Sequence, residues 1–467
     1  MLKLIVSLCL VFSILAAKSI IAQLAFEKIY GGSGDDYGYS VQQTLDGGYI
    51  ITGMTRSFGA GLSDVYLIKT NPSGDTLWTR TYGGNLDDEG RFVHQTTDGG
   101  YIIAGTTESF GAGSADIWLI KTNSSGETIW TRTFGGSDED RCYSGNTTAD
   151  GGYCIVGSTS SFPSDVYLIR TDSLGSTLWS KTYGSSEHDI GYSVQETFDG
   201  GYIIGGWTYS PSLTPVFLIK TDSQGDTLWT KKYIPPYFWI YTMSTQQTSD
   251  SGYIVTTTYG RADQHGYLIK TNSSGDTLWT RNWLGFANSI NLTMDGGFII
   301  SGHPTLIKTD SSGDTLWTRA FFDCIGMSVQ QTTDDGYIVV GLTNLQPSNI
   351  CLIKTFGDGT VDVRKLADEY VPTEFQLEQN FPNPFNPTTT ISWQSPVGSW
   401  QTLKIYDVLG REIANLVDEY KPAGNYEIEF NASGLSSGVY FYRLQAGDPS
   451  RSSGQGFVDT KKLILLR

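Results

Sequence analysis

Four aspartates stand at the same position of a repeated pattern and are the first candidates for chemistry: Asp36, Asp88, Asp140 and Asp189. Each has an acidic neighbour, and these are Asp35, Asp87, Glu139 and Glu187. Carboxylate oxygens gathered around a channel mouth can hold Ca²⁺ or attract a cationic ligand. Converging carboxylates would also suit a glycan-processing hydrolase or lyase. The structural alternative, which we favour, is turn chemistry, because Asp accepts hydrogen bonds from nearby backbone N–H groups.

An aromatic segment is the second candidate. Residues 233–241 read Tyr-Ile-Pro-Pro-Tyr-Phe-Trp-Ile-Tyr, and Tyr237, Phe238 and Trp239 have no aromatic counterparts at the same position of the other repeats. An exposed aromatic surface binds sugars or peptides and often marks an interface. The alternative is a loop that packs over the next, shortened repeat, and the sequence leaves both interpretations open.

Other reactive residues form no recognisable site. The four histidines are scattered (His94, His188, His265 and His303), and the chain has no CxxC spacing, so we expect neither a catalytic triad nor a histidine–cysteine metal site. Four cysteines follow residue 22, namely Cys142, Cys154, Cys324 and Cys351. No pair stands in facing register, so we expect free, buried thiols. The only cofactor we consider is Ca²⁺ at the four aspartates.

The elements that position these residues come from an internal repeat, which indicates the fold. A Gly-Asp-Thr-Leu-Trp phrase with small variations ends at Trp78, Trp130, Trp179, Trp229, Trp279 and Trp317. An Asp-Gly-Gly-Tyr mark and a Leu-Ile-Lys-Thr mark each recur seven times. The first repeat contains four β-type runs (37–44, 49–55, 64–70 and 76–82) separated by glycine-containing turns. Four strands in about 50 residues are typical of one propeller blade.

The count of repeats predicts a closed ring. Seven tyrosine-type marks accompany only six tryptophans, and residues 24–32 align with residues 76–84, so that Phe26 takes the place of the missing tryptophan. An N-terminal strand that completes the last blade removes the exposed edges of an open sheet. We therefore predict an all-β, seven-bladed β-propeller over residues 23–360. Phe26 and the six tryptophans are its packing repeat, since each large ring buries extensive apolar area.

Both ends of the chain predict export. Residues 1–22 combine a cationic start with an apolar run of about 14 residues, which is typical of a signal peptide and too short to span a bilayer. No second long apolar segment follows, so we expect no transmembrane span after signal removal. The net charge of −17 makes nucleic acid an unfavourable partner because phosphate backbones are repelled.

The C-terminal residues follow a different sequence pattern after a polar connector at 361–379. The segments Asn380–Thr389, Leu403–Arg411, Ala423–Gly424, Ser437–Leu444 and Lys461–Leu463 closely resemble the type A sorting domain of the bacterial type IX secretion system. The residues that carry the motif are Asn383, Pro384, Asp407, Gly410, Arg411, Gly438 and Tyr440. Independently of that resemblance, short strands between Pro, Gly and Asp turns predict a small antiparallel, Ig-like β-sandwich over residues 380–467.

The resemblance implies an export route and a cellular location. A protein with this domain crosses the inner membrane by its signal peptide and the outer membrane through the type IX translocon, and a sortase-like peptidase often attaches it to surface lipopolysaccharide. We therefore expect a secreted or outer-membrane-attached protein. We expect the propeller to act as a binding, adhesion or scaffold module for a glycan or protein ligand. The alternative function is a secreted glycan-processing enzyme, and fold alone does not decide between them.

Overall fold

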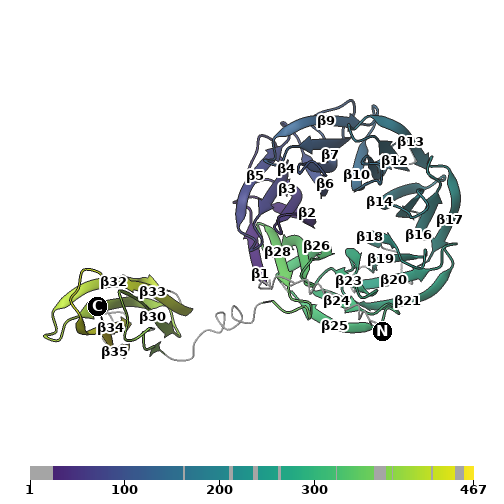
Figure 1. Ribbon diagram of the computed structural model, residues 1–467. Helices are drawn as coiled ribbons and strands as arrows, with labels where there is room; N and C mark the ends of the chain where they lie inside the picture. Colours follow the sequence, from purple (N-terminus) through teal and green to yellow (C-terminus); the bar gives the residue numbers. More distant parts are fainter. Residues whose placement is uncertain are drawn as a thin grey trace, which may run out of the picture. The chain divides into compact units, whose positions relative to one another are not determined.

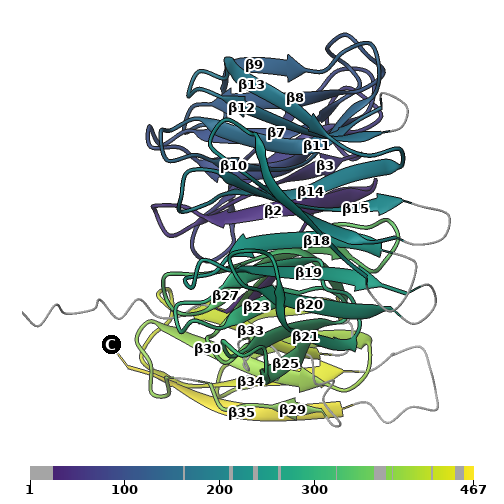
Figure 2. The same ribbon diagram turned by 90° about the vertical axis from the view of Figure 1, so that its right-hand side faces the viewer.

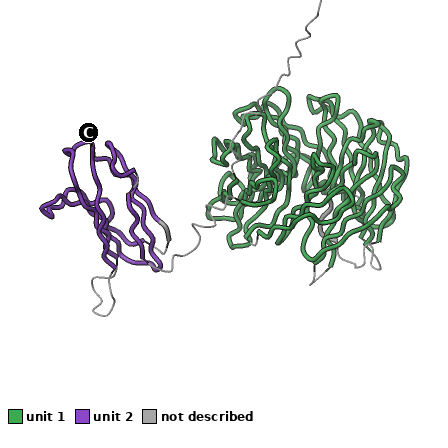
Figure 3. The backbone as a smooth tube through the Cα atoms, turned by 60° about the horizontal axis from the view of Figure 1, so that its bottom comes forward, with its two compact units in different colours: residues 1–361 green, residues 362–467 purple. Residues whose placement is uncertain are grey.

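The chain forms two compact units, residues 1–361 and 362–467, which are coloured separately in Figure 3. This computed structural model describes residues 25–160, 164–209, 214–234, 240–260, 264–321, 323–361, 375–380, 382–421, 424–446 and 457–466. The expected signal peptide, residues 1–22, lies outside the described residues, as do Tyr237, Phe238 and Trp239. Within the described part of the chain, no helix has the length and apolarity needed to cross a membrane.

The first unit is a ring of seven four-stranded antiparallel sheets (Figure 1), which confirms the predicted propeller. Blade 1 contains β2 (Asp36–Gln43), β3 (Tyr49–Thr55), β4 (Asp64–Thr70) and β5 (Thr76–Tyr82). Blade 2 contains β6 (Asp88–Gln95), β7 (Tyr101–Thr107), β8 (Asp116–Thr122) and β9 (Thr128–Phe134). Blade 3 contains β10 (Asp140–Thr147), β11 (Tyr153–Thr159), β12 (Asp165–Thr171) and β13 (Thr177–Tyr183). Blade 4 contains β14 (His188–Glu196), β15 (Tyr202–Tyr209), β16 (Val216–Thr221) and β17 (Thr227–Tyr233).

The remaining three blades continue the ring. Blade 5 contains β18 (Ile240–Gln247), β19 (Tyr253–Tyr259), β20 (His265–Thr271) and β21 (Thr277–Leu284). Blade 6 is shortened and contains β22 (Ser289–Leu292), β23 (Phe298–Ser301), β24 (Thr305–Thr309) and β25 (Thr315–Ala320). Blade 7 contains β26 (Cys324–Gln331), β27 (Tyr337–Thr343), β28 (Ile350–Thr355) and, from the start of the chain, β1 (Phe26–Tyr30).

Burial explains why the four strands of each blade differ in amino-acid composition. Every residue of β3 and β4 is buried, as a strand covered by neighbouring sheets on both faces requires. The innermost strand β2 alternates buried and half-buried residues, and the outermost strand β5 is half-buried or exposed. The innermost strands surround the centre of the ring and run roughly along its axis (Figure 1, Figure 2).

The ring closes through β1, which pairs antiparallel with β28 from Phe26 opposite Lys354 to Tyr30 opposite Ile350. The Tyr30 hydroxyl donates a 2.6 Å hydrogen bond to the Gly74 carbonyl of blade 1. Phe26 and Tyr30 belong to one buried cluster with side chains of both blade 1 and blade 7. The N-terminal strand therefore completes the last sheet and contacts the first.

One aromatic contact repeats at all seven blade junctions. The ring of each outer strand meets the aromatic ring that begins the second strand of the following blade, at centroid distances of 5.5–6.5 Å. The pairs are Phe26–Tyr49, Trp78–Tyr101, Trp130–Tyr153, Trp179–Tyr202, Trp229–Tyr253, Trp279–Phe298 and Trp317–Tyr337. A glycine in the next blade approaches each ring so closely that a Cβ would clash, as Gly126 does at Trp78.

A buried cation repeats within each blade as well. The Lys or Arg of the Leu-Ile-Lys-Thr mark is only 2–7% exposed and pairs with the aspartate of the preceding turn. The pairs are Lys69–Asp46, Lys121–Asp98, Arg170–Asp150, Lys220–Asp199, Lys270–Asp250, Lys308–Asp295 and Lys354–Asp334. Each pair ties the third strand to the turn between the first and second strands, so the two recurrent marks of the sequence form one structural unit.

The cysteines correct one expectation. Cys324 and Cys351 form a disulfide with a Cα–Cα distance of 6.0 Å, although we expected free thiols. The expectation considered only cysteines that lie opposite each other on adjacent strands. Cys324 begins β26 and Cys351 lies in β28, with β27 between them in the sheet. The residue opposite Cys351 on β27 is Gly341, which has no side chain. Cys142 and Cys154 are free and buried, and burial raises the pKa of each thiol to about 12.

The second unit is a sandwich of two antiparallel sheets. One sheet contains β29 (Gln376–Leu377), β30 (Thr388–Ser395) and β33 (Gly424–Asn431). The other contains β32 (Glu412–Lys421), β31 (Ser399–Tyr406), β34 (Gly438–Ala446) and β35 (Phe457–Leu465). Trp393, Leu403 and Tyr442 are among the buried side chains between the sheets.

The expected connector at 361–379 is too long at its C-terminal end. Gln376 and Leu377 pair with Gln394 and Trp393, and Leu377 is buried in the core of the sandwich. Part of the polar segment is therefore an edge strand of the second unit, which two residues of strand are too short to reveal in the sequence.

Candidate functional site: the central channel

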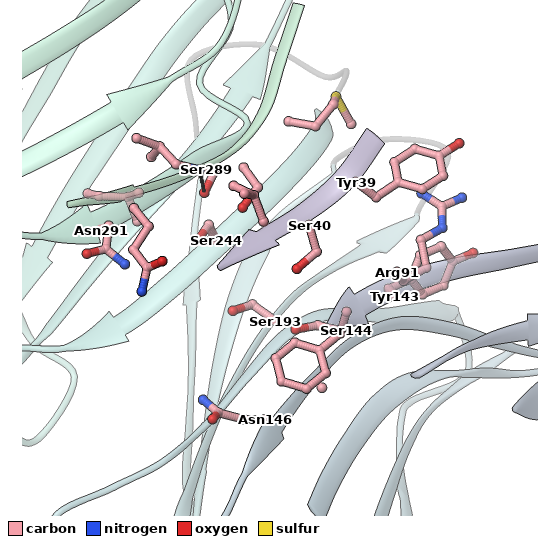
Figure 4. Close-up of a pocket in the computed structure, with 18 of the residues that line it drawn as sticks. Tyr39, Ser40, Arg91, Tyr143, Ser144, Asn146, Ser193, Ser244, Ser289 and Asn291 are labelled. Atoms are coloured by element: carbon pink, nitrogen blue, oxygen red, sulfur yellow. Dashed lines mark hydrogen bonds between the residues drawn. The ribbon is translucent and has the colours of Figure 1, made fainter. Parts of the chain in front are cut away.

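The central channel of the propeller is a cavity with a volume of about 590 Å³. Residues from all seven innermost strands line it, and Figure 4 shows several of them. A serine stands at one level in six of the seven blades: Ser40, Ser144, Ser193, Ser244, Ser289 and Ser328. Blade 2 has Phe92 there instead. The wall is therefore rich in hydroxyl and amide groups.

Side chains of one blade cap the backbone of the next blade along this wall. The innermost strands are sheet edges, so half of their N–H groups have no partner in their own sheet. Oε1 of Gln42 accepts a 2.6 Å hydrogen bond from the Gln95 N–H, and Oγ of Ser40 accepts one of 3.3 Å from the Val93 N–H. A Ser-x-Gln segment thus satisfies two edge donors of its neighbour.

The lower cap forms wherever the side chain is glutamine. Gln42, Gln195, Gln246 and Gln330 each accept from the following blade, at 2.6–3.0 Å. His94, Asn146 and Asn291 occupy the same position at the other three junctions, and no described side chain accepts from the N–H groups of Thr147, Glu196 and Gln331 there. The reason is geometric for the asparagines, because Asn is one methylene shorter than Gln.

Bulges place the residues at one mouth of the channel. The register shifts in six of the seven innermost strands: β18 shifts between Ile240 and Met243, and the extra residue of β26 is Met327. In blades 1 to 4 the extra residues are Tyr39, Arg91, Tyr143 and Tyr192. A bulge re-aims a side chain and is frequent next to functional sites. All four line the channel, and Arg91 lies between Tyr39 and Tyr143 in Figure 4.

The bulge residues of blades 1 to 4 form two groups of ring contacts at this mouth. The Arg91 guanidinium lies 4.0 Å from the Tyr39 ring centroid, a cation–π arrangement. The Tyr143 and Tyr192 ring centroids are 4.5 Å apart, and Tyr192 stacks on Trp207 at 6.1 Å. Blades 1 to 4 thereby present aromatic rings and one guanidinium at this mouth.

The mouth carries paired rather than free charge. Arg91 forms two hydrogen bonds to Glu89, of 2.8 and 3.0 Å, and Arg141 pairs with Glu108 and Glu139. Burial raises the pKa of Tyr39 and of Tyr192 to about 12, so both hydroxyls are neutral donors at pH 7. Lower in the channel, burial lowers the pKa of His94, which favours the neutral imidazole.

The four predicted aspartates lie at the starts of innermost strands, and none of them lines the channel. Asp36 is fully buried and accepts hydrogen bonds from the Gly32 N–H at 2.8 Å, from Ser57 Oγ at 2.6 Å and from Thr55 Oγ1. The other three aspartates accept from the Gly84, Gly136 and Ser185 N–H groups in the same way. These contacts hold the loop between two blades.

The Ca²⁺ hypothesis stays a prediction. Among the described residues, no group of three or more His, Cys, Asp or Glu side chains is arranged to hold a metal ion. The predicted aromatic site at Tyr237, Phe238 and Trp239 belongs to the part of the chain that the structure does not describe.

The motif residues of the second unit are mostly structural. The Asn383 side chain accepts from the Ile464 N–H at 2.9 Å and donates to the Lys462 carbonyl, so the Asn383–Pro384 segment docks on β35. Asp407 accepts from the N–H groups of Leu409 and Arg411 and pairs with the Arg411 guanidinium, and Gly410 has a φ of 77° in this turn.

The remaining two motif residues belong to β34, which Gly438 begins. The Tyr440 hydroxyl donates to the Ser436 carbonyl at 2.9 Å. These motif residues therefore fix a turn or the start of a strand.

The sequence reasoning missed the channel wall, although a signal was present. Ser-Val-Gln occurs at 40–42, 193–195 and 328–330, and Ser-Thr-Gln occurs at 244–246. A polar triplet that recurs once per blade on a strand facing the axis indicates a ring of hydrogen bonds. His94 and Asn146 interrupt that series on adjacent blades.

Comparisons with known proteins identify only the second unit. Residues 379–455 match the family model described as the secretion system C-terminal sorting domain. No protein with a curated description matches the chain.

Solved structures resemble the chain at low identity. They include the PorZ surface component of the type IX secretion system of Porphyromonas gingivalis (12% identity, TM-score 0.43, 94% of this chain and 60% of that one). A Dyadobacter fermentans protein of unknown function (13%, 0.44, 71% and 98%) and one from Bacteroides caccae (12%, 0.40, 54% and 90%) are also similar. TM-scores this low carry no argument about function.

The motif residues, the two-sheet sandwich and the family match agree with one another. The C-terminal unit is a type IX secretion sorting domain, and the chain is a secreted, cell-surface protein.

Proposed function

We propose that the propeller is a binding module displayed at the cell surface and that its central channel is the recognition site. The observation that carries this proposal is the channel of about 590 Å³, whose lining includes the bulge residues Tyr39, Arg91, Tyr143 and Tyr192. Ligand sites typically measure ~300–1,000 Å³ and combine apolar rings with a few well-placed polar groups. Hydroxyl, amide and aromatic side chains recognise a ligand without reacting with it.

The aspartates favour binding over hydrolysis. A glycosidase needs two carboxyl groups on either side of the bond to be cleaved, with one free to donate a proton. The carboxylates of Asp36, Asp88 and Asp189 each accept two or more hydrogen bonds from their own loops. Such carboxylates stabilise loops, which favours the binding interpretation over the glycan-processing alternative.

Export is the second part of the proposal. Residues 1–22 direct the chain to the periplasm, and the translocon then recognises the sorting domain. A sortase-like peptidase removes that domain and attaches the propeller to the outer membrane. Deletion of residues 380–467 is expected to leave the protein in the periplasm, as measured by fractionation. Surface display of the truncated chain would contradict this route.

Channel filling tests the recognition site. Phe92 shows that the serine level accepts a phenylalanine in one blade, so Ser144→Phe and Ser244→Phe should fold and obstruct the channel. Binding of the full secreted chain to glycan and peptide arrays is expected to disappear in both variants. The control is Leu178→Ala, at an outer-strand side chain that is exposed. Array binding that survives both phenylalanines would refute the channel as the recognition site.

A further inference from the structure

One wall of the channel differs from the rest. The glutamine caps are absent at three junctions, and two of these are adjacent, from blade 2 to blade 3 at His94 and from blade 3 to blade 4 at Asn146. Thr147 lies opposite Tyr153 in its sheet, as Gln95 lies opposite Tyr101. The Gln95 N–H donates away from its own sheet to a side chain of the preceding blade. By register, the N–H groups of Thr147 and Glu196 also point away from their own sheets, next to Asn146 and Gln195 of the channel lining.

These groups form a local surplus of hydrogen-bond donors. No described side chain accepts from the N–H groups of Thr147 and Glu196. An unpaired polar group costs free energy unless water or a ligand satisfies it. The side-chain amide of Asn146 adds two further donors at the same level. The lower part of this wall therefore matches a ligand with acceptor oxygens.

The upper part of the same wall is aromatic. Arg91, Tyr143 and Tyr192 are the bulge residues of β6, β10 and β14, the three strands that contain His94, Asn146 and Glu196. From the bulge to the donor level is three to four residues, or about 10–13 Å at the ~3.3 Å rise of a strand. A ligand that reaches both levels is elongated, with apolar faces at one end and oxygen acceptors at the other.

Charge and backbone direction narrow the ligand class. Arg91 and Arg141 are already paired with glutamates, and the protein has a net charge of −17, so an anion gains little here. An extended peptide would need a row of free N–H and C=O groups along one strand edge. The open N–H groups of Thr147 and Glu196 lie on two different strands.

We infer that the wall formed by β6, β10 and β14 binds a neutral oligosaccharide. Pyranose C–H faces pack on the rings of Tyr143 and Tyr192, and hydroxyl or N-acetyl oxygens accept from the open donors below. This inference rests on the channel being the recognition site. It adds the ligand class and the side of the channel that binds.

The test restores the missing caps. His94→Gln together with Asn146→Gln gives both junctions the residue that closes four others, so the variant should fold with an unchanged or higher melting temperature. Its glutamines would occupy the donors that the saccharide needs. The matched control is Asn291→Gln, the same repair at the junction from blade 6 to blade 7. The full secreted chain is titrated calorimetrically with tri-N-acetylchitotriose and maltotriose, and in parallel with trigalacturonate and a neutral hexapeptide.

The expected result is that at least one neutral trisaccharide binds the wild-type chain. The double variant should bind it at least about tenfold more weakly, and Asn291→Gln should stay within about twofold. Absence of binding to both neutral trisaccharides, or equal binding by the double variant, would overturn the inference. Binding of trigalacturonate or the peptide alone would also overturn it. If that binding is lost in Ser144→Phe, the channel remains the recognition site and only the ligand class is wrong.

Discussion

Replacement of Phe26 by alanine tests how the ring is closed. The Phe26 ring is 7% exposed and packs against Tyr49 of blade 1, and its strand is held to blade 7 by pairing with β28. Truncation of a buried phenylalanine to alanine costs about 3–5 kcal/mol. Unfolding entropy of ~2.1 cal/mol/K per residue over a propeller of this length makes each kcal/mol worth about 1.4 °C. The melting temperature should therefore fall by about 4–7 °C in calorimetry.

A second substitution on the same strand serves as the control. Ile29 is 61% exposed, so Ile29→Ala should change the melting temperature by less than about 1 °C, as is usual for surface positions. Limited proteolysis provides an independent readout, because a loosened β1 should be cleaved ahead of the rest of the propeller. If Phe26→Ala melts and resists protease like Ile29→Ala, the first strand does not clasp the ring.

Two further predictions concern the covalent and ionic ties. Cys324→Ser combined with Cys351→Ser should lower the free energy of unfolding by about 3–4 kcal/mol, because the disulfide joins residues 27 positions apart. A reductant should destabilise the wild type to a similar extent and leave the double variant unchanged. Equal stability of the wild type and the double variant would contradict this prediction. Acid should weaken the buried cation pairs. Hydrogen bonds from Arg170 lower the pKa of Asp150 from 3.8 to about 2. At Asp98, burial raises the pKa, but hydrogen bonds from Lys121, Thr96 and Gly100 outweigh this effect and lower the pKa to about 2. Because the folded-state pKa is depressed, this stability is present above pH 3.8 and is lost as the pH falls toward 2, so thermal melts should show a steep decline in that range, and a flat profile would refute it.

Sequence periodicity was sufficient to predict the propeller, because the same local sequence pattern recurs from blade to blade. Three of the four strands expected in blade 1 have the bounds that the structure gives, and the first, β2, differs by one residue at each end. The closing strand could also be inferred, since Phe26 aligns with a tryptophan whose contacts repeat at every junction. These features depend on residues close in sequence or on a count of repeats.

Features that join different strands or blades escaped the sequence reasoning. The Gln330 side chain caps Gln43 across the closure of the ring, 287 residues apart in the chain. That contact exists only once the ring is closed, so no local pattern could reveal it. The disulfide was missed for a related reason, because Cys324 and Cys351 are not on adjacent strands. The recurrent aspartates were visible, but the contacts of Asp36, for example, depend on Gly32 and Ser57, which come from different connections.

Because the blades repeat one pattern closely, the positions at which a blade differs from that pattern are informative. A glutamine cap contributes about 1 kcal/mol as a hydrogen bond, so His94 and Asn146 each give up stability that a single substitution would restore. A loss scattered at random would not be expected to coincide with other departures. Here the two adjacent losses lie on β6 and β10, whose bulge residues Arg91 and Tyr143 belong to the mouth with the aromatic rings. Stability given up beside an aromatic mouth is more economically explained by a ligand that uses the open donors than by chance.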